Sequence, residues 1–230
     1  MQTTLSLRVT DMKTKLLLMC GALAGPLFTV AWFLQGLVRA DYDPMRHPIS
    51  SLSIGESGWI QNASFIITGL LTLALAAGLR RALQPQGGSK WGANWITAVG
   101  IGLIGAGLFV TDPLNAYPPG TPLMPLQPSI TGRFHRLFSA FVFFGLPGAS
   151  FVLGRLFARR GEQAWAMYSR LSGTAFIIAF ILTSIGFGQI EPLVRYAGLL
   201  QRLTLLIGMA WMTLLPLYLM HSAGRARMER

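Results

Sequence analysis

The sequence predicts an all-α polytopic membrane protein, a single domain built as a bundle of six transmembrane helices. Of the 230 residues, 52% are hydrophobic and only 12% are charged, and the mean hydropathy is +0.51. A soluble domain carries about 25% charged residues. The apolar residues also occur in blocks of about 20, which is the length of helix that crosses a bilayer. The third observation, the distribution of Lys and Arg, predicts the orientation.

Six apolar blocks predict the helices in chain order. With the turns that flank each apolar core included, we expect helices at about 16–38, 59–79, 93–111, 134–157, 169–190 and 199–221. The first block is longer than the apolar region of a secretory signal, which has about 7–15 residues, so we expect it to be a retained helix. It contains Cys20, and because this is the only cysteine, no disulfide within the chain is expected.

Lys and Arg are alternately dense and sparse in successive connections, and this alternation predicts the topology. One side of the bundle holds 13 of the 19 basic residues: Arg8, Lys13, Lys15, Arg80, Arg81, Lys90, Arg155, Arg159, Arg160, Arg170, Arg225, Arg227 and Arg230. The other side holds Arg39, Arg46, Arg133, Arg136, Arg195 and Arg202. Basic short loops stay in the cytoplasm, so both termini are expected there. The net charge of +11 thus reflects topology and attraction to anionic lipid, and no nucleic-acid partner is expected.

Each outer connection opens with an acid followed by proline: Asp43-Pro44, Asp112-Pro113 and Glu191-Pro192. Such a pair ends a helix at the interface, because the residue before proline avoids helical geometry. It also delivers a carboxylate to the outer rim each time. The second of these connections has six prolines between Asp112 and Gly132, which predicts an extended, stiff loop. This loop is interpreted either as a lid over the outer mouth or as a rigid turn.

The polar side chains suited to chemistry gather on the outer side of the predicted bundle. As candidate catalytic residues we take Asp43, Asp112, His135 and Glu191. As candidate substrate-binding residues we take Arg46, His47, Ser50, Asn62, Arg133 and Arg195. General acid–base chemistry needs a carboxyl group against an apolar wall and a second ionisable group nearby, which Asp112 and Glu191 would supply if they turn inward.

Two other interpretations compete with acid–base chemistry. A metal site would find ligands of the right kind in His47, His135, Asp112 and Glu191, but no pair has the i, i+4 spacing that fixes two ligands on one helix face. We therefore expect no metal, and no cofactor, since paired histidines within helices that would hold haem are missing. In the structural interpretation, these acids and arginines form loop salt bridges and helix caps.

His135 is the strongest single candidate. In the stretch GRFHRLFSA it lies between Arg133 and Arg136, with Ser139 one turn further on the same helix face. A histidine that enters the bilayer level is expected to face protein or a water-filled cavity, and such residues are candidates for function. The two arginines would bind a phosphate or carboxylate group, or extend to the outer lipid headgroups.

The stretch DPMRHPISSLSIGESGWIQNASFIITGL resembles the pattern of a prokaryotic integral membrane family, domain of unknown function 998. The matching positions are Asp43, Pro44, Arg46, His47, Ile49, Ser50, Leu52, Gly55, Trp59, Asn62, Gly69 and, later, His135. Where the pattern leads us to expect an acid after Ile49-Ser50, this chain has Ser51. The resemblance implies a six-helix, multi-pass protein of the bacterial cytoplasmic membrane, and it implies no chemistry.

Together these features predict a polar pocket at the outer face that binds an amphipathic molecule, a lipid or an isoprenoid derivative. Acid–base catalysis, such as hydrolysis or proton-initiated cyclisation, is the reaction type we expect there. A small transporter and a non-catalytic subunit that docks a membrane protein partner are the alternatives. The transporter is less favoured because no acid or base lies midway through an apolar block, where transporters place their coupling sites.

Overall fold

The computed structural model describes residues 11–83 and 90–228, with side chains described up to Gly224. Within these residues it has no strand, and it has six long helices: α1 (Met12–Val38), α2 (Gly58–Leu83), α3 (Lys90–Leu108), α4 (Ile130–Arg159), α5 (Gln163–Phe187) and α6 (Ala197–Met228). All six are long and apolar enough to cross a membrane. The predicted all-α membrane fold is confirmed, and the protein is a multi-pass membrane protein.

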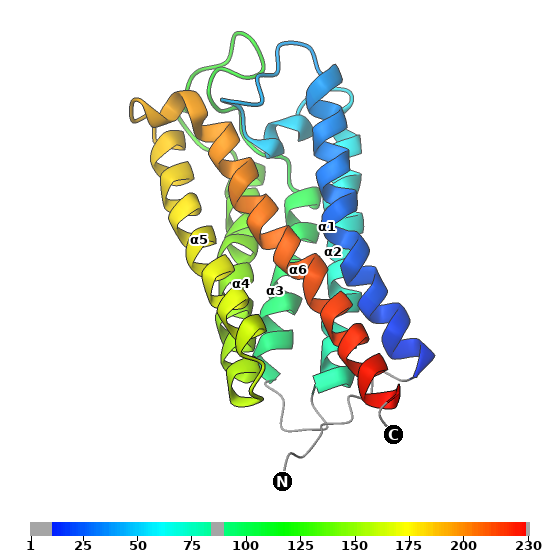
Figure 1. Ribbon diagram of the computed structural model, residues 1–230. Coiled ribbons are helices and arrows are strands. Elements are labelled where there is room, and N and C mark those ends of the chain that lie inside the picture. Colours follow the sequence, from blue (N-terminus) through cyan, green and yellow to red (C-terminus); the bar gives the residue numbers. More distant parts are fainter. Residues whose placement is uncertain (1–10, 84–89, 229–230) are drawn as a thin grey trace.

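The helices form a ring in chain order (Figure 1). Each helix packs against the next one along the chain, and α6 returns to pack against α1. The interior of the ring is filled by large apolar side chains, of which Phe28, Phe157, Phe176 and Trp211 are fully buried. The indole N–H of Trp211 donates to the hydroxyl of Ser169 over 3.1 Å, so this buried polar group is satisfied.

The observed helix ends differ from the predicted ones by a few residues. The helices α1 to α5 each start or finish several residues beyond their predicted bounds, in turns that an apolar pattern does not detect, and α6 continues well beyond the predicted residue 221. In contrast, α3 ends at Leu108 and α5 at Phe187, three residues before the predicted ends in each case. After α5 the chain leaves helical geometry at Gln189, which has a φ of 65°. Apolar residues beyond a helix end therefore misled the prediction.

Local capping explains where two helices begin. The Asp11 carboxylate accepts the Thr14 backbone N–H at the start of α1, over 2.7 Å. The Ser129 hydroxyl accepts the Gly132 backbone N–H at the start of α4, over 2.9 Å. Both bonds satisfy a donor that has no partner inside its own helix. Arg81 at the end of α2 also reaches Asp11, over 3.3 Å, and so ties α1 to α2.

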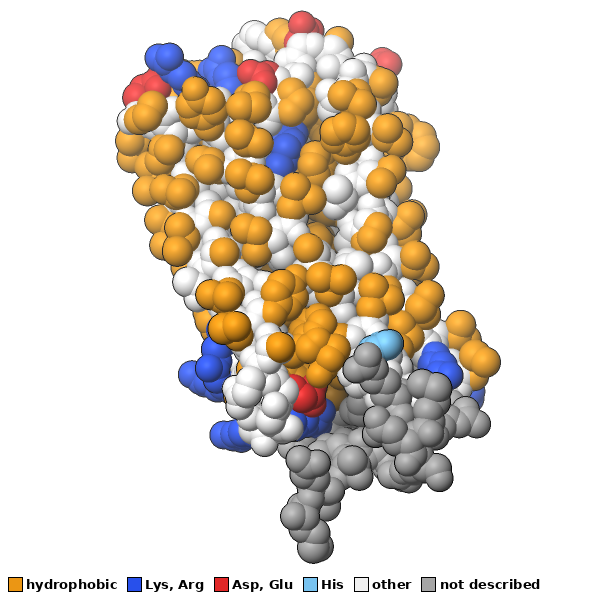
Figure 2. All heavy atoms as spheres, viewed as in Figure 1, with side chains coloured by type: hydrophobic (Ala, Val, Ile, Leu, Met, Phe, Trp, Pro, Cys, Tyr) orange, Lys and Arg blue, Asp and Glu red, His pale blue; other side chains and the backbone are white. Residues whose placement is uncertain are grey.

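Three connections lie at one end of the ring, at residues 39–57, 109–129 and 188–196, and we call this the outer end. They include the 3₁₀ helices η2 (Ile49–Ser53) and η4 (Leu193–Tyr196). The start of α1 and the end of α6 lie at the opposite end (Figure 1). Hydrophobic side chains cover the middle of the visible face, and most charged side chains gather toward its two ends (Figure 2). This pattern is the one expected for a bundle that spans a bilayer.

Candidate functional site

A cavity of about 310 Å³ opens at the outer end, between α4, α5, α6, η2 and the loop at 109–129. Its polar lining comprises Ser50, Thr111, Asp112, His135, Arg136, Ser139, Ser184 and Gln201. Its apolar lining includes Phe143, Phe180 and Phe187. The proline-rich loop forms part of its wall through Thr111–Leu114 and Pro125.

A second, smaller chamber of about 40 Å³ lies inward of this cavity. The two share Ser50, His135, Ser139, Phe143 and Gln201, so these residues surround the junction between them. Beyond the junction the small chamber is walled by apolar side chains of α1, α2, α3 and α6, among them Phe28, Phe65, Leu103 and Leu205. The site therefore passes from a polar mouth to the apolar interior of the ring.

His135 is held by the end of the neighbouring helix. Its Nδ1 lies 3.1 Å from the Ala106 carbonyl oxygen and 2.8 Å from that of Phe109, where α3 ends. Carbonyl oxygens only accept hydrogen bonds, so Nδ1 carries the proton in the neutral ring and Nε2 has the free lone pair. Within the described chain, Nε2 has no hydrogen-bond partner. The ring is buried yet lines both chambers, so it is placed to accept a proton from a bound molecule.

Asp112 uses one carboxylate oxygen and leaves the other free. Its Oδ1 accepts the Ser129 backbone N–H over 3.2 Å, just before α4. Its Oδ2 is buried without a partner among residues 11–83 and 90–228. A negative charge is favoured at a helix N-terminus, because the helix dipole is positive there. This position explains why a carboxylate is tolerated in the wall of a partly apolar cavity.

Gln201 of α6 fixes η2 against the helix ring. Its Oε1 accepts the Ile49 backbone N–H over 2.8 Å. The amide group is thereby oriented, and its Nε2 remains a donor with no partner in the described residues. Because Gln201 lines both chambers, this donor belongs to the same junction as His135.

Aromatic side chains from α4 and α5 form the apolar wall. The rings of Phe143 and Phe180 are stacked with centroids 4.6 Å apart, and Phe144 meets Phe180 edge-on at 6.1 Å. The lining residues Arg136 of α4 and Ser184 of α5 are exposed, so the cavity wall reaches the surface of the bundle on the side of these two helices.

The first outer loop packs into an aromatic cluster of its own. The buried His47 ring lies between Tyr42 and Tyr117, with centroids 5.6 Å and 5.0 Å away. Its Nδ1 accepts the Asp43 backbone N–H over 2.8 Å. Burial lowers the pKa of His47 below its ordinary value, against the opposing effect of the Asp43 carboxylate. Burial also raises the pKa of Tyr42 to about 12.

Arg202 of α6 fastens the same loop to the ring. This buried guanidinium donates to the carbonyl oxygens of Pro44, His47 and Gly198 over 2.7 to 3.1 Å, and to the Tyr42 hydroxyl over 2.5 Å. It also lies 5.3 Å from the centroid of the Trp32 ring, within range of a cation–π interaction. No carboxylate pairs with it among the residues that the structure describes, so carbonyl oxygens and aromatic faces stabilise its charge.

Asn115 joins the three outer loops. Its side-chain amide donates to the Arg46 carbonyl oxygen over 2.7 Å, and its Oδ1 accepts from Gln189 over 2.5 Å. Arg46, Asn115 and Gln189 belong to the first, second and third outer connections respectively. With an exposed fraction of 1%, the Asn115 side chain is fully buried among these loops. The loop at 109–129, which forms part of the cavity wall, is therefore fixed to the other two loops near its start.

The structure brings three of the predicted site residues together in the cavity: Ser50, Asp112 and His135. Four others, Asp43, Arg46, His47 and Asn62, do not line the cavity. Asp43 accepts the Met45 backbone N–H over 2.8 Å and forms no ion pair with Arg46 in the described chain. His47 packs in the aromatic cluster, and Asn62 lies on α2 with its Oδ1 buried and unpartnered.

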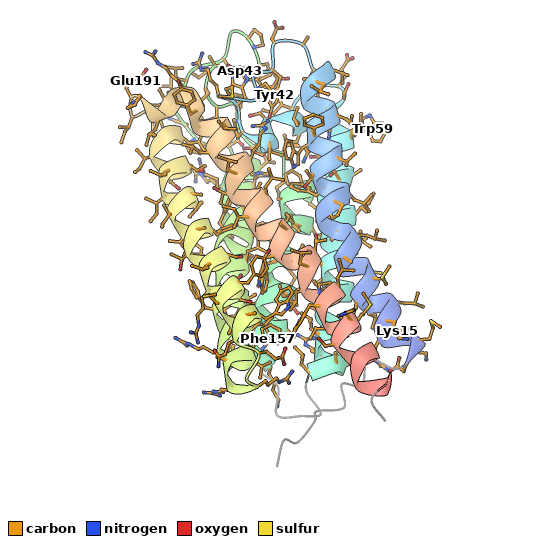
Figure 3. The ribbon with its side chains drawn as sticks, viewed as in Figure 1. Lys15, Tyr42, Asp43, Trp59, Phe157 and Glu191 are labelled. Carbon is orange, nitrogen blue, oxygen red and sulfur yellow. The ribbon has the colours of Figure 1, made fainter. Side chains whose placement is uncertain are left out.

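The other three predicted residues are exposed. Glu191 and Arg195 form an ion pair of 3.1 Å on the corner between α5 and α6. Figure 3 shows Glu191 at this corner, apart from Tyr42 and Asp43. Arg133 is exposed in the first turn of α4 and does not line the cavity, whereas Arg136 does. The placement of Glu191 differs from the inward orientation that acid–base chemistry would require, because its partner Arg195 holds it in the solvent-facing turn.

Sequence reasoning missed the two polar residues at the start of the last helix, Gln201 and Arg202. The signal was present, since two strongly polar residues stand together where an apolar block begins. Polar groups at membrane depth face the interior of the bundle and have a partner there. Both residues in fact turn inward and hold the first outer loop.

Metal ligation finds no support in the arrangement of side chains. Across 11–83 and 90–228 there is no group of three or more His, Cys, Asp or Glu side chains close enough to hold an ion. His47 and His135 each use Nδ1 in a hydrogen bond to the main chain. Cys20 is a free thiol, half-buried within α1.

Comparison with known proteins identifies a family for this chain but does not indicate an activity. No match was found among curated proteins or among solved structures. One family model, described as a protein of unknown function, matches residues 22–218, which span all six helices except the first turns of α1 and the end of α6. The match includes the residues that line the cavity, the hydrogen bonds of Asn115 and the first outer loop. The chain therefore belongs to the family of membrane proteins of unknown function DUF998.

Proposed function

We propose that this protein binds an amphipathic lipid or isoprenoid-derived molecule in the outer cavity and acts on it by acid–base chemistry. The observation that carries the proposal is a cavity with a polar mouth and an aromatic wall, whose lining includes exposed residues of two neighbouring membrane helices. A polar mouth next to an apolar wall matches the two halves of an amphipathic molecule. The exposed lining residues of α4 and α5 support delivery of that molecule from the bilayer.

His135 takes the role of general base in this proposal. Its tautomer leaves Nε2 free to accept a proton, and the ring cannot turn without losing its bonds to α3. Asp112, with its buried free Oδ2, supplies a negative charge on the same cavity wall. That charge would stabilise the imidazolium that forms when His135 takes up a proton.

The charge distribution of the sequence supports an outward-facing cavity in the bacterial cytoplasmic membrane. Most basic residues belong to the end opposite the cavity, and basic connections remain cytoplasmic. Some of them, such as Arg8 and Arg230, lie outside the described residues. The proposed substrate would then be a lipid of the outer leaflet.

Turnover of a lipid extract tests the proposal. Purified protein is incubated with total polar lipids of a bacterial membrane, and products are followed by liquid chromatography and mass spectrometry. Wild type should form a product, and His135→Gln or Asp112→Asn should lower its rate at least about 100-fold, since general acid–base catalysis supplies factors of this size. Glu191→Gln, at an exposed ion pair away from the cavity, is the control and should leave the rate unchanged. Full turnover in both cavity variants contradicts the proposal.

A further inference from the structure

The junction between the two chambers has a fixed pattern of hydrogen-bonding groups that specifies the polar part of the ligand. His135 and Gln201 both line both chambers, together with the hydroxyl-bearing Ser50 and Ser139. Their free nitrogen atoms are the Nε2 of His135 and the Nε2 of Gln201. What a ligand must offer here depends on which of these donates and which accepts.

The hydrogen bonds that His135 and Gln201 already make to the main chain determine which free nitrogen donates and which accepts. The α3 carbonyl oxygens require a proton on Nδ1 of His135, which leaves Nε2 as an acceptor. The Ile49 backbone N–H requires the carbonyl oxygen of Gln201 to face it, which leaves the Gln201 amide N–H₂ as a donor. A flipped Gln201 would place its N–H₂ against the N–H of Ile49 and lose that bond. These two nitrogen atoms therefore present one acceptor and one donor to the junction, and the hydroxyls of Ser50 and Ser139 adapt to either role.

Charged groups fit this pair poorly. A carboxylate or phosphate only accepts, so it would face the lone pair of the neutral His135 ring and would pair with it only after the ring takes up a second proton. An ammonium group only donates, so it would leave the amide of Gln201 without an acceptor. A hydroxyl group donates and accepts through one atom and satisfies both nitrogens. The charged residues of the cavity, Asp112 and Arg136, have opposite signs and favour neither kind of ion.

The remaining lining suits an alkyl or prenyl chain. Phe143, Phe180 and Phe187 form the apolar side of the large chamber. A volume of about 310 Å³ lies at the lower end of small-molecule sites, so it holds the polar end and the first part of a chain. The rest of the chain would lie along Phe144 and Ile181, which are 63% and 52% exposed on the outside of α4 and α5.

We propose that the ligand is an amphipathic alcohol, whose hydroxyl group donates to Nε2 of His135 and accepts from Nε2 of Gln201 while its chain follows the aromatic wall. This inference rests on the proposed function, since it names the substrate class of the same cavity. It adds the prediction that the polar group is uncharged. It also makes Gln201 a residue that determines specificity.

A series of four probes with one shared long alkyl chain tests the inference: the alcohol, its methyl ether, the carboxylate and the phosphate monoester. Binding to the full-length protein in lipid nanodiscs is measured by the rise in unfolding temperature with probe concentration. The alcohol should bind about tenfold more tightly than the ether, because the ether has no proton for His135 and leaves its buried lone pair unpaired. The carboxylate and the phosphate should also bind less tightly than the alcohol.

Gln201→Glu is the decisive variant. Its side chain keeps an oxygen for the Ile49 N–H and replaces only the donor with a second acceptor, so the fold of the loop is retained. The variant should bind the alcohol about tenfold less tightly than wild type, and Glu191→Gln should bind like wild type. The ratio between variant and wild type cancels differences in how each probe partitions into lipid. The unfolding temperature without probe shows whether the variant remains folded.

Four outcomes would overturn one or both proposals. An ether that binds as tightly as the alcohol, or a charged probe that binds more tightly, overturns the inference and leaves the proposed amphipathic site intact. Unchanged alcohol binding in a folded Gln201→Glu protein does the same. If none of the four probes binds wild type, the proposed function fails together with the inference.

Discussion

Arg202 is a buried cation whose hydrogen bonds go to main-chain carbonyl oxygens and a tyrosine hydroxyl. Replacing it by methionine keeps the apolar stem but removes the donors to Pro44, His47 and Gly198. Buried acceptors left without donors are costly, so Arg202→Met should lower the free energy of unfolding by about 3 kcal/mol. Thermal unfolding in detergent measures this. Arg195→Met, at an exposed ion pair, is the matched control and should change it by less than about 0.5 kcal/mol. Equal effects of the two changes would contradict the role of Arg202.

His47 predicts a dependence of stability on pH. Burial lowers its pKa in the folded protein, with Arg46 and Arg202 acting in the same direction and Asp43 in the opposite one. The neutral ring is thus favoured by folding, and at pH values above the unfolded pKa of about 6.5 this contribution is fully present. As the pH falls through 6.5 toward the lower folded pKa, the unfolded chain takes up the proton first and stability is lost. Protonation of Nδ1 would also break its bond to the Asp43 N–H.

The measurement is the unfolding temperature at several pH values between about 7.5 and about 5.5, around the ordinary pKa of histidine. His47→Asn keeps an acceptor but cannot take up a proton, so its unfolding temperature should fall less over this range than that of wild type. Other groups that titrate in this range contribute equally to both proteins and cancel in the difference. Parallel curves for the two proteins would show that His47 does not contribute.

At the scale of the helices, close packing of backbones stabilises the bundle, because lipid offers no hydrophobic driving force for burying apolar surface between helices. Gly102 of α3 stands four residues from Ala98 and from Ala106, a spacing of small residues that permits such contacts. A Cβ atom built at Gly102 would lie 2.6 Å from the carbonyl oxygen of Phe138 in α4. That oxygen belongs to the main chain and cannot move without shifting the helix. The α3–α4 contact therefore depends on this glycine.

Gly102→Ala should lower the free energy of unfolding by about 2 kcal/mol through overpacking. The comparison is Gly224→Ala near the end of α6, where no atom lies within 4 Å of the added carbon. There alanine should be neutral or stabilise the helix by up to about 1 kcal/mol. Unfolding temperatures of the two variants in the same detergent measure the difference. A Gly102→Ala protein as stable as wild type would mean that α3 and α4 can separate freely.

The elements could be predicted from the sequence more securely than their ends. Apolar blocks specify six helices because each must satisfy its backbone groups within the bilayer. The stops after Leu108 and Phe187 depend instead on single residues, such as Gln189 in left-handed geometry. The sequence also shows three similar acid–proline exits. Only Asp112 among their acids lines the cavity, because the next helix begins beside it and directs its carboxylate inward.

At the scale of the whole molecule, the ring order of the helices decides which polar residues meet. His135 of α4 and Ser50 of η2 are far apart in the sequence, yet both line the cavity at the outer end, where η2 also contacts α6. The sequence indicated His135 through its position at membrane depth. The polar pair Gln201-Arg202 indicated an inward-facing position on the last helix, but not that Gln201 would lie beside His135. That pairing depends on the closure of α6 onto α1 and on the bond from Ile49.

The ring also explains how a polar site is held in an apolar bundle. Its outer loops are tied together at Asn115 and fastened to α6 by Arg202, so the cavity wall is built on rigid helix ends. The interior below the junction is packed with aromatic and aliphatic side chains. An amphipathic ligand is the kind of molecule that matches both parts.

The most direct measurement of this central claim is native mass spectrometry of the protein released from membranes, with identification of any bound molecule. Wild type is expected to carry an amphipathic molecule. Ser139→Trp, which fills the junction, should lose it. Leu70→Trp, on the exposed face of α2 away from the cavity, should keep it. A wild-type protein without a bound amphipathic molecule, or one retained equally by both variants, would contradict the account.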